Sequence, residues 1–199
     1  MDYYQTIADN FQSTIDTITM SVDTLAESIE RGSQLMAAAL LADRKIIVCG
    51  NGVDAALAQL FACHLLNRFE EDRPALPVLT LGTDNAAVTA IAQASSINDI
   101  FSRQLRALGQ ADDVLLCINS AKGAGNLVRA VQAAQERNMG VLVLSNSRDG
   151  ELGALIRPED VQLLVSATRQ ARIVEMHTMI IHNFCELLDH SLFGNYYRE

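Results

Sequence analysis

Five short apolar runs, rich in Val, Ile and Leu, recur through the middle of the chain. Each run is almost continuously hydrophobic, which is typical of strands buried on both faces of a sheet. The runs occupy residues 45–50, 77–81, 113–118, 141–145 and 161–166. Helical patterns separate them and occupy residues 53–70, 98–108 and 124–138. This alternation predicts an α/β fold with a five-stranded parallel sheet, right-handed crossovers and flanking helices.

Apolar residues at helical spacing also mark both flanks of this core. Residues 3–42 hold them in two segments, and residues 169–189 hold them in one. A helix with an apolar face outside a complete sheet sandwich needs a partner, so these arms predict an oligomer surface. We expect a single domain over residues 1–199, composed of an N-terminal helical arm (1–42), an α/β core (43–168) and a C-terminal helix and tail (169–199).

Length and composition suit a globular protein, because 199 residues with 49% hydrophobic content can bury a sizeable core. No apolar stretch has the length of a membrane span, and the first residues lack the pattern of a secretion signal. The four cysteines lie in apolar contexts without metal-ligand spacing, as expected for free thiols in a reducing compartment. A net charge of −9 without a Lys/Arg cluster opposes direct binding to nucleic acid. We therefore expect a cytoplasmic protein that binds neither membranes nor nucleic acid directly.

The turn after the first strand has the form of an anion site but carries an acid. Gly50 and Gly52 allow a sharp turn, and the unpaired N–H groups that open the next helix attract anions. Asp54 falls in the first turn of that helix, where its carboxylate would satisfy these donors and repel a phosphate. Asp54 is equally well explained as a residue that favours the start of a helix. Both explanations predict weak phosphate binding.

Ligands of parallel sheets bind beyond the carboxyl ends of the strands, so the loops there should converge on one crevice. The residues expected to line this crevice are Asn51, Gly52, Asp54, Asp84, Asn85, Ser120 and Lys122. The loop 119–125 holds one hydroxyl and one cation, and Lys122 is its only strong attractor of anions. The same glycine-containing loop is also typical of a flexible turn that caps the following helix.

Several segments taken together resemble the sugar isomerase (SIS) domain family. They are Cys49-Gly-Asn-Gly, Asn67-Arg-Phe-Glu-Glu-Asp-Arg-Pro-Ala-Leu-Pro, Thr83-Asp-Asn, Gln104-Leu-Arg-Ala-Leu-Gly-Gln-Ala-Asp-Asp-Val-Leu-Leu and Ala171-Arg-Ile-Val-Glu-Met-His. The resemblance covers nearly the whole chain and is closest to two groups: the phosphoheptose isomerases, and the DiaA group of non-catalytic relatives that bind the replication initiator DnaA. Members of both groups are homotetramers, so the resemblance implies a homotetramer here.

The resemblance also implies which positions would carry an isomerase reaction on sedoheptulose 7-phosphate, and several of them are altered. The phosphate-binding serine of the family is Asp54 here. The glutamate that acts as base and binds zinc aligns with His64. Of the other zinc ligands, one histidine aligns with Leu60, the glutamine aligns with Val174, and only the second histidine is retained, as His182.

These losses predict almost no catalysis, because a positioned acid or base typically contributes about 10² to 10⁴ in rate. The crevice aspartate of the family is also missing, since Ala94 stands there. His64 could replace the glutamate as a base at neutral pH, and His64, His182 and Cys185 could form a transition-metal site. The alternative is that these histidines, like His177, are structural. We expect no catalytic residues, no metal site and no cofactor, with zinc only in the case of an isomerase.

The C-terminal tail supplies the positive evidence for a function. Gly194 should end the last helix and leave Leu192 and Phe193 exposed. The pair resembles the Leu-Phe pair with which the DiaA group contacts DnaA, although packing against a neighbouring subunit explains it as well. We therefore interpret the chain as a non-catalytic, DiaA-like homotetrameric adaptor that binds DnaA and promotes its assembly at the origin. The alternatives are a phosphosugar isomerase and a sugar-phosphate-binding sensor.

Overall fold

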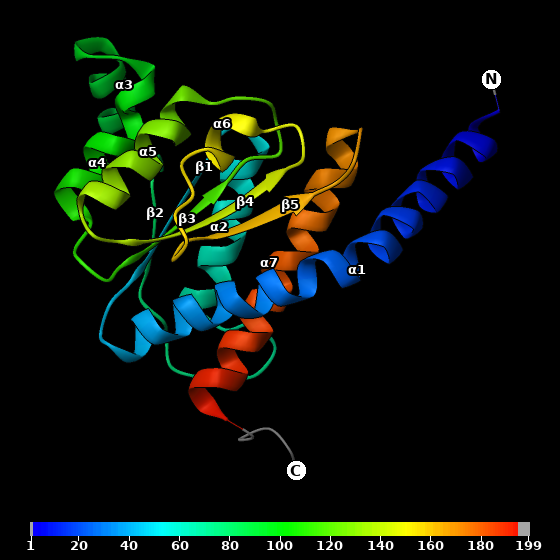
Figure 1. Ribbon diagram of the computed structural model, residues 1–199, viewed down its shortest axis with the longest axis horizontal. Helices are drawn as coiled ribbons and strands as arrows, with labels where there is room; N and C mark the ends of the chain where they lie inside the picture. Colours follow the sequence, from blue (N-terminus) through cyan, green and yellow to red (C-terminus); the bar gives the residue numbers. More distant parts are fainter. Residues whose placement is uncertain (1, 195–199) are drawn as a thin grey trace.

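A parallel five-stranded sheet forms the centre of the computed structural model, which describes residues 2–194 (Figure 1). Its strands are β1 (Ile46–Gly50), β2 (Val78–Thr80), β3 (Val114–Ile118), β4 (Gly140–Asn146) and β5 (Val161–Val165). Their order across the sheet is β2-β1-β3-β4-β5, and each neighbouring pair is parallel. The predicted α/β class and all five predicted strands are confirmed, with each strand end within one residue of its expected place.

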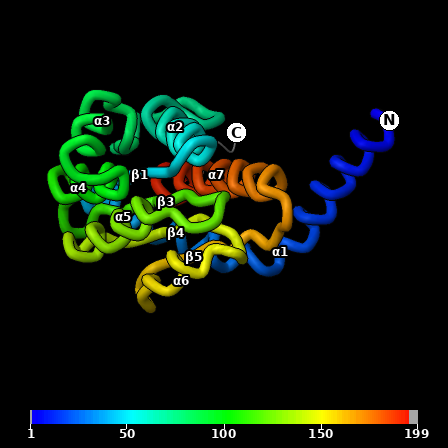
Figure 2. Tube along the Cα trace, turned by 90° about the horizontal axis from the view of Figure 1, so that it is seen from above, coloured from blue at the N-terminus to red at the C-terminus, as the bar shows by residue number. Residues whose placement is uncertain are grey.

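Helices cover both faces of the sheet (Figure 2). They are α1 (Tyr3–Leu41), α2 (Val53–Leu66), α3 (Asn85–Ala94), α4 (Ile100–Leu108), α5 (Gly125–Glu136), α6 (Gly150–Gly153) and α7 (Gln170–Phe193), with a 3₁₀ turn, η1, at Ile97–Asp99. The helix predicted over 53–70 therefore ends earlier, at Leu66, and the one predicted over 169–189 continues to Phe193.

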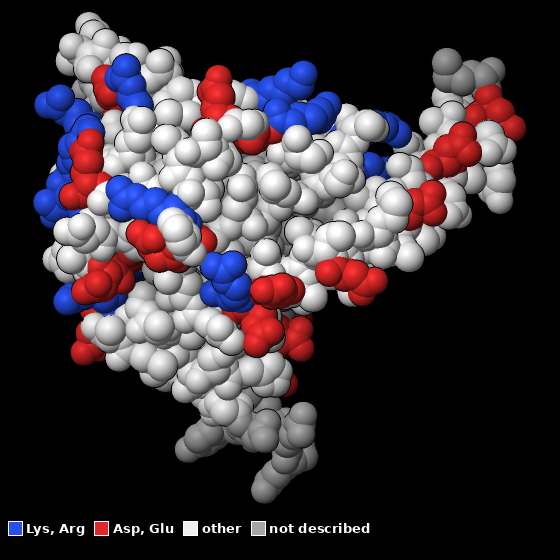
Figure 3. All heavy atoms as spheres, viewed as in Figure 1, with Lys and Arg blue, Asp and Glu red and all other residues white. Residues whose placement is uncertain are grey.

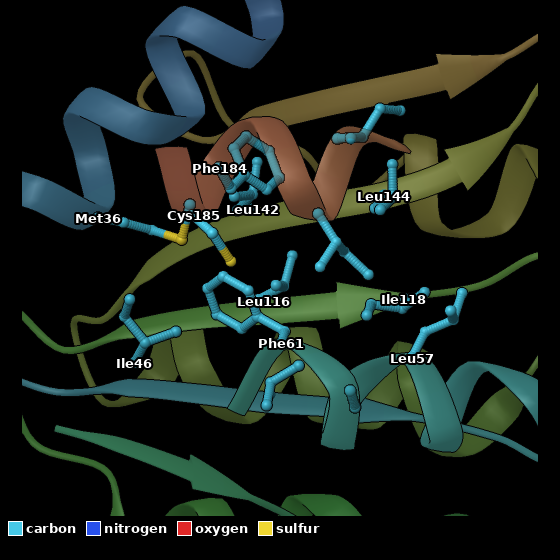
Figure 4. Packing of buried hydrophobic residues seen from close by; sticks show 14 of the residues in the cluster. Met36, Ile46, Leu57, Phe61, Leu116, Ile118, Leu142, Leu144, Phe184 and Cys185 are labelled. Carbon is cyan, nitrogen blue, oxygen red and sulfur yellow. The ribbon is translucent and has the colours of Figure 1, made fainter. Parts of the chain in front are cut away.

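The continuous hydrophobicity of the strands is explained by two separate cores, one on each side of the sheet. Ile46 and Val48 of β1 pack with α1, α2 and α7, whereas Ile47 and Cys49 pack with α4 and α5. In the first core, Phe61 of α2 lies over the sheet and faces the side chains of α7 (Figure 4). This packing fixes α2 against α7, and the two helices carry several of the residues expected to form a site.

Two features of the helices differ from the sequence prediction. The N-terminal arm is one continuous helix of 39 residues instead of two segments. Its first half projects from the body and exposes large apolar side chains, including Tyr4 and Phe11 (Figure 1). Helix α3 was not predicted, because its small apolar residues are only partly covered and none is buried.

The described cysteines are free thiols, and their exposure is uneven. Cys49, Cys117 and Cys185 are buried, whereas Cys63 on α2 is exposed. Across residues 2–194 we find no helix that combines the length and the hydrophobicity needed to cross a membrane.

Candidate functional site

The loops at the carboxyl end of the sheet, where the sequence predicts a crevice, include the loop between β1 and α2. Gly52 adopts a φ of 56°, a left-handed conformation that glycine reaches at little cost. The side-chain amides of Asn51 and of Asn126, on the first turn of α5, exchange two hydrogen bonds of 2.9 and 2.8 Å. This reciprocal pair joins the first loop to α5 and already satisfies part of the amide donors and acceptors that a ligand could have used.

Asp54 lies in the first turn of α2, but it does not cap its own helix. Its carboxylate Oδ2 accepts a hydrogen bond of 2.9 Å from the backbone N–H of Ser120, in the loop after β3. The expectation that Asp54 satisfies the donors of α2 was therefore wrong, because its side chain is turned toward the neighbouring strand's loop. The carboxylate instead binds a backbone donor of the loop that contains Lys122, the residue expected to attract anions.

Asp54 is almost completely buried from solvent. The residue is only 2% exposed, and its second carboxylate oxygen, Oδ1, has no hydrogen-bond partner among the described residues. Burial raises the pKa of Asp54 from its ordinary value, and the hydrogen bonds from Ser120 partly offset that rise. Gly50 permits the approach, since a Cβ there would lie 2.7 Å from the backbone of Asp54.

The loop after β3 is tied to two other elements. Ser120 is buried, and its Oγ accepts a hydrogen bond of 3.0 Å from Gln170 at the start of α7. Asn119 donates to the carboxylate of Asp149, in the loop after β4. The amide of Asn146 donates to two backbone carbonyls of the loop after β3, at 3.3 and 2.8 Å. The loops after β1, β3 and β4 thus converge, as expected for a parallel sheet.

The remaining crevice residues lie farther out. Lys122 is exposed at the tip of the loop after β3. Asp84 accepts a hydrogen bond of 3.0 Å from the backbone N–H of Ala87 and so caps α3, while Asn85 is the first residue of that helix. Within the described chain, no hydrogen bond joins Asp84 or Asn85 to the other crevice loops. The loop after the edge strand β2 therefore does not join the hydrogen-bonded cluster.

A second group of polar side chains lies at the other end of α2. The rings of His64 and His182, on α7, have centroids 5.6 Å apart, and the ring of Phe69 lies 5.1 Å from His64. The Nε2 atom of His64 is buried without a hydrogen-bond partner among residues 2–194. His64 and His182 therefore meet within one chain. Ten residues of helix, about 15 Å, separate His64 from Asp54.

The donors around this pair do not fit zinc. A catalytic zinc site normally takes three protein ligands. Leu60 and Val174 offer no donor atom, and burial raises the pKa of the Cys185 thiol to about 12, which disfavours the thiolate that binds metals. No group of three or more His, Cys, Asp or Glu residues suited to a metal ion occurs in the described part of the chain.

The structure also changes the interpretation of the tail. Gly194 caps α7 with a φ of 66°, as expected. Leu192 and Phe193 are not exposed, however, but half-buried, and they pack against the core cluster shared by α1, α2 and α7. The reason is that the helix includes both residues and turns them toward the protein, where the Phe193 ring lies 5.9 Å from Cζ of Arg73. They are not free anchors for a partner.

Arg73 was not identified as a site residue from the sequence. Its guanidinium donates to Asp189 on α7 (2.6 Å) and to the carbonyl oxygens of His64 (2.9 Å) and Leu65 (3.0 Å). Arg73 is only 8% exposed. The signal available in the sequence was the Asp72-Arg73-Pro74 segment inside a family-like motif, but nothing there points to Asp189.

His177 has the structural position that the sequence suggested. It is fully buried, and its Nε2 donates to the carbonyl oxygen of Ser145 at 3.1 Å. Burial lowers the pKa of His177 from 6.5 to about 4, and the hydrogen bond to Ser145 partly counteracts this shift. The imidazole is therefore neutral at physiological pH and takes no part in the cluster of His64 and His182.

Comparison with known proteins identifies one family over most of the chain. A family profile described as SIS domain matches residues 10–146. Phosphoheptose isomerases from Chromohalobacter salexigens and Alkalilimnicola ehrlichii are 42% and 45% identical to it, and each match covers 98% of this chain and 99% of the relative. The solved structure of a phosphoheptose isomerase from Francisella tularensis gives a TM-score of 0.92 at 33% identity, covering 96% of this chain and all of the other.

These matches overturn the interpretation of the chain as a non-catalytic adaptor for DnaA. The curated relatives that share 40–45% of their residues with it over nearly their full length are named phosphoheptose isomerases. The adaptor interpretation also depended on exposure of Leu192 and Phe193, which the structure does not show. Both findings favour the isomerase alternative.

We predict that Asp54 limits phosphate binding. Asp54→Ser should lower the Kd for sedoheptulose 7-phosphate by about 10-fold or more, because the Ser120 N–H would become free for a charge-assisted hydrogen bond. Isothermal titration calorimetry measures the change. Asp2→Ser is the matched control, since it removes the same charge from the exposed N-cap of α1. If the Kd of Asp54→Ser equals that of the wild type, the cause of weak phosphate binding lies in the loop after β3 and not in Asp54.

We predict that His177 makes the protein acid-sensitive. Because the native pKa lies below the unfolded value, the unfolded state binds the proton first, and stability is lost as pH falls from 6.5 to about 4. The loss should reach up to about 3 kcal/mol. Urea unfolding of the wild type and of His177→Gln across this range isolates the effect. A constant difference in unfolding free energy between the two proteins would contradict it.

Proposed function

The chain belongs to the SIS domain family, and on that basis we propose that it is a phosphosugar isomerase of the phosphoheptose isomerase group. The observation that carries the proposal is the pair of imidazoles formed by His64 and His182, with ring centroids 5.6 Å apart. This pair lies in a chain with curated relatives that are 40–45% identical to it over nearly their full length and are named phosphoheptose isomerases.

Two imidazoles can supply the groups that the reaction requires. Aldose–ketose isomerisation moves a proton between adjacent carbons and needs a base together with a second acid/base for the oxygens. A neutral imidazole is a competent base near pH 7. The Nε2 of His64 has no hydrogen-bond partner among the described residues, so once it becomes accessible to the substrate it can accept the carbon-bound proton, and His182 can give a proton to the carbonyl oxygen. We propose that this exchange proceeds without a bound metal, because Leu60 and Val174 offer no ligand.

The loop after β3 offers one cation for the phosphate of such a substrate. Lys122 is exposed at the tip of this loop and would attract the phosphate. The buried carboxylate of Asp54 already accepts the hydrogen bond from the Ser120 N–H and would repel the phosphate there.

A sugar-phosphate sensor is a second candidate, favoured by one observation. Asp54 accepts the hydrogen bond from the Ser120 N–H, so this donor is not free for a phosphate. A ligand bound only by the outer residues of these loops would not reach His64. Such a protein would bind a sugar phosphate but would not turn it over.

We also propose that the chain forms a homotetramer in the cytoplasm. The first thirty residues contain no Lys or Arg, and the projecting half of α1 shows acidic side chains among broad uncharged stretches (Figure 3). Between α1 and α7 lies a hollow of about 570 Å³. Its apolar lining includes Leu25, Ile29, Met176, Met179, Ile180 and Leu187. Packing of arms from other copies would cover both surfaces.

We predict that His64 carries the turnover. The wild type should convert sedoheptulose 7-phosphate to its aldose, and His64→Gln should lower kcat by about 10²- to 10⁴-fold. Coupled assay of product formation measures both. His190→Gln, a change at an exposed position of α7, is the matched control. Binding of the sugar phosphate by an inactive wild type would identify a sensor, and absence of both binding and turnover would refute the proposed function.

We predict that the arm holds the tetramer together. Light scattering should give four chain masses for the wild type and a smaller mass for Phe11→Ala combined with Ile15→Ala, because both side chains are exposed in a single chain. Gln12→Ala, on the same arm, should leave the mass unchanged. A monomeric wild type at micromolar concentration would show that the apolar faces have another purpose.

A further inference from the structure

The extended segment after α2 sends one buried arginine back to the end of that helix. The last four carbonyl groups of a helix have no partner within the helix itself. Arg73 supplies donors for two of them, with Nη2 2.9 Å from the His64 oxygen and Nη1 3.0 Å from the Leu65 oxygen. The backbone of the residue that carries the first imidazole is therefore held directly by a guanidinium.

The same guanidinium also holds the helix that carries the second imidazole. Its Nε donates to Oδ1 of Asp189 at 2.6 Å, and the Arg73 side chain is fully buried. Asp189 follows His182 by seven residues, or about two helical turns, so both side chains lie on the same face of α7. The ring of Phe193 covers the guanidinium at 5.9 Å. One planar group thus connects the two histidine-bearing elements.

We propose that Arg73, anchored by Asp189, is a positioning residue for the isomerase step. It keeps the Nε2 of His64 and the ring of His182 at the separation needed for proton transfer. This inference rests on the proposed function. A rigid fork with several fixed donors can bind two carbonyl groups and a carboxylate at once, whereas an ammonium group on a flexible chain cannot reproduce that geometry.

The contacts predict different effects for substitutions of Arg73 and of Asp189. Arg73→Lys keeps the charge but loses the fork, so the end of α2 and the anchor on α7 are both loosened. Asp189→Asn keeps the bonds from Arg73 to the two α2 carbonyls and weakens only the anchor on α7. Small errors in the position of a reacting group cost up to about 100-fold in rate, even when the fold is intact.

The test compares the full-length wild type with Arg73→Lys and Asp189→Asn. Arg106→Lys is the matched control, because Arg106 forms an exposed pair with Glu136. For each protein we would measure kcat and KM with sedoheptulose 7-phosphate, the thermal midpoint, and the nuclear Overhauser contact between the ring protons of His64 and His182. A substrate deuterated at the transferred position gives the isotope effect on kcat.

We expect kcat to fall by about 10- to 100-fold in Arg73→Lys and less in Asp189→Asn, with KM within about threefold of the wild type. The ring contact should weaken and the isotope effect on kcat should increase, because proton transfer becomes rate-limiting. Arg106→Lys should match the wild type in each measurement.

Retention of the ring contact and of kcat in folded Arg73→Lys would overturn the proposal and leave Arg73 as a helix cap. If Arg73→Lys does not fold, the same two measurements on Asp189→Asn, the ring contact and kcat, test the proposal. If the wild type shows no turnover, the proposed function fails, but the ring contact still decides whether Arg73 positions the two imidazoles.

Discussion

The arrangement of the candidate site depends on how α2 is held at its two ends. Its buried face, with Phe61 at the centre, packs between the sheet and α7. At its start, the Asp54 carboxylate crosses to the Ser120 N–H, and at its end the Arg73 guanidinium binds two of its carbonyl groups. Both contacts are buried charge-assisted hydrogen bonds, which are stronger than neutral ones. One helix therefore fixes both the crevice loops and the histidine pair.

Local pattern was sufficient for the sheet but not for the contacts that organise the site. A strand covered on both faces must be apolar at nearly every position, so the five strands could be located to within one residue. The convergence of the crevice loops followed from the same topology. The bond between Arg73 and Asp189 joins positions 116 residues apart, and nothing in either local sequence specifies it. The partner of Asp54 was missed for the same reason.

Leu192 and Phe193 are more buried than their position at a helix end predicts. Leu192 and Phe193 were correctly placed next to the glycine that ends α7, but nearness to a helix end does not determine exposure. The helix continues through both residues, and its direction turns them onto the core and onto Arg73. The family resemblance implies altered residues at Leu60, His64 and Val174. These residues change the groups available for catalysis, but they do not show that the protein acts as an adaptor for a partner.

The uneven exposure of the four thiols has a practical consequence. Cys63 is exposed, whereas the other three cysteines are buried in the two cores. Thiolate chemistry requires access, so a maleimide or other alkylating dye should react selectively at one native position. That position immediately precedes His64 along the chain. The protein thus carries its own attachment point for a fluorophore beside the histidine pair, and ligand occupancy could be followed by emission without introducing or removing any cysteine.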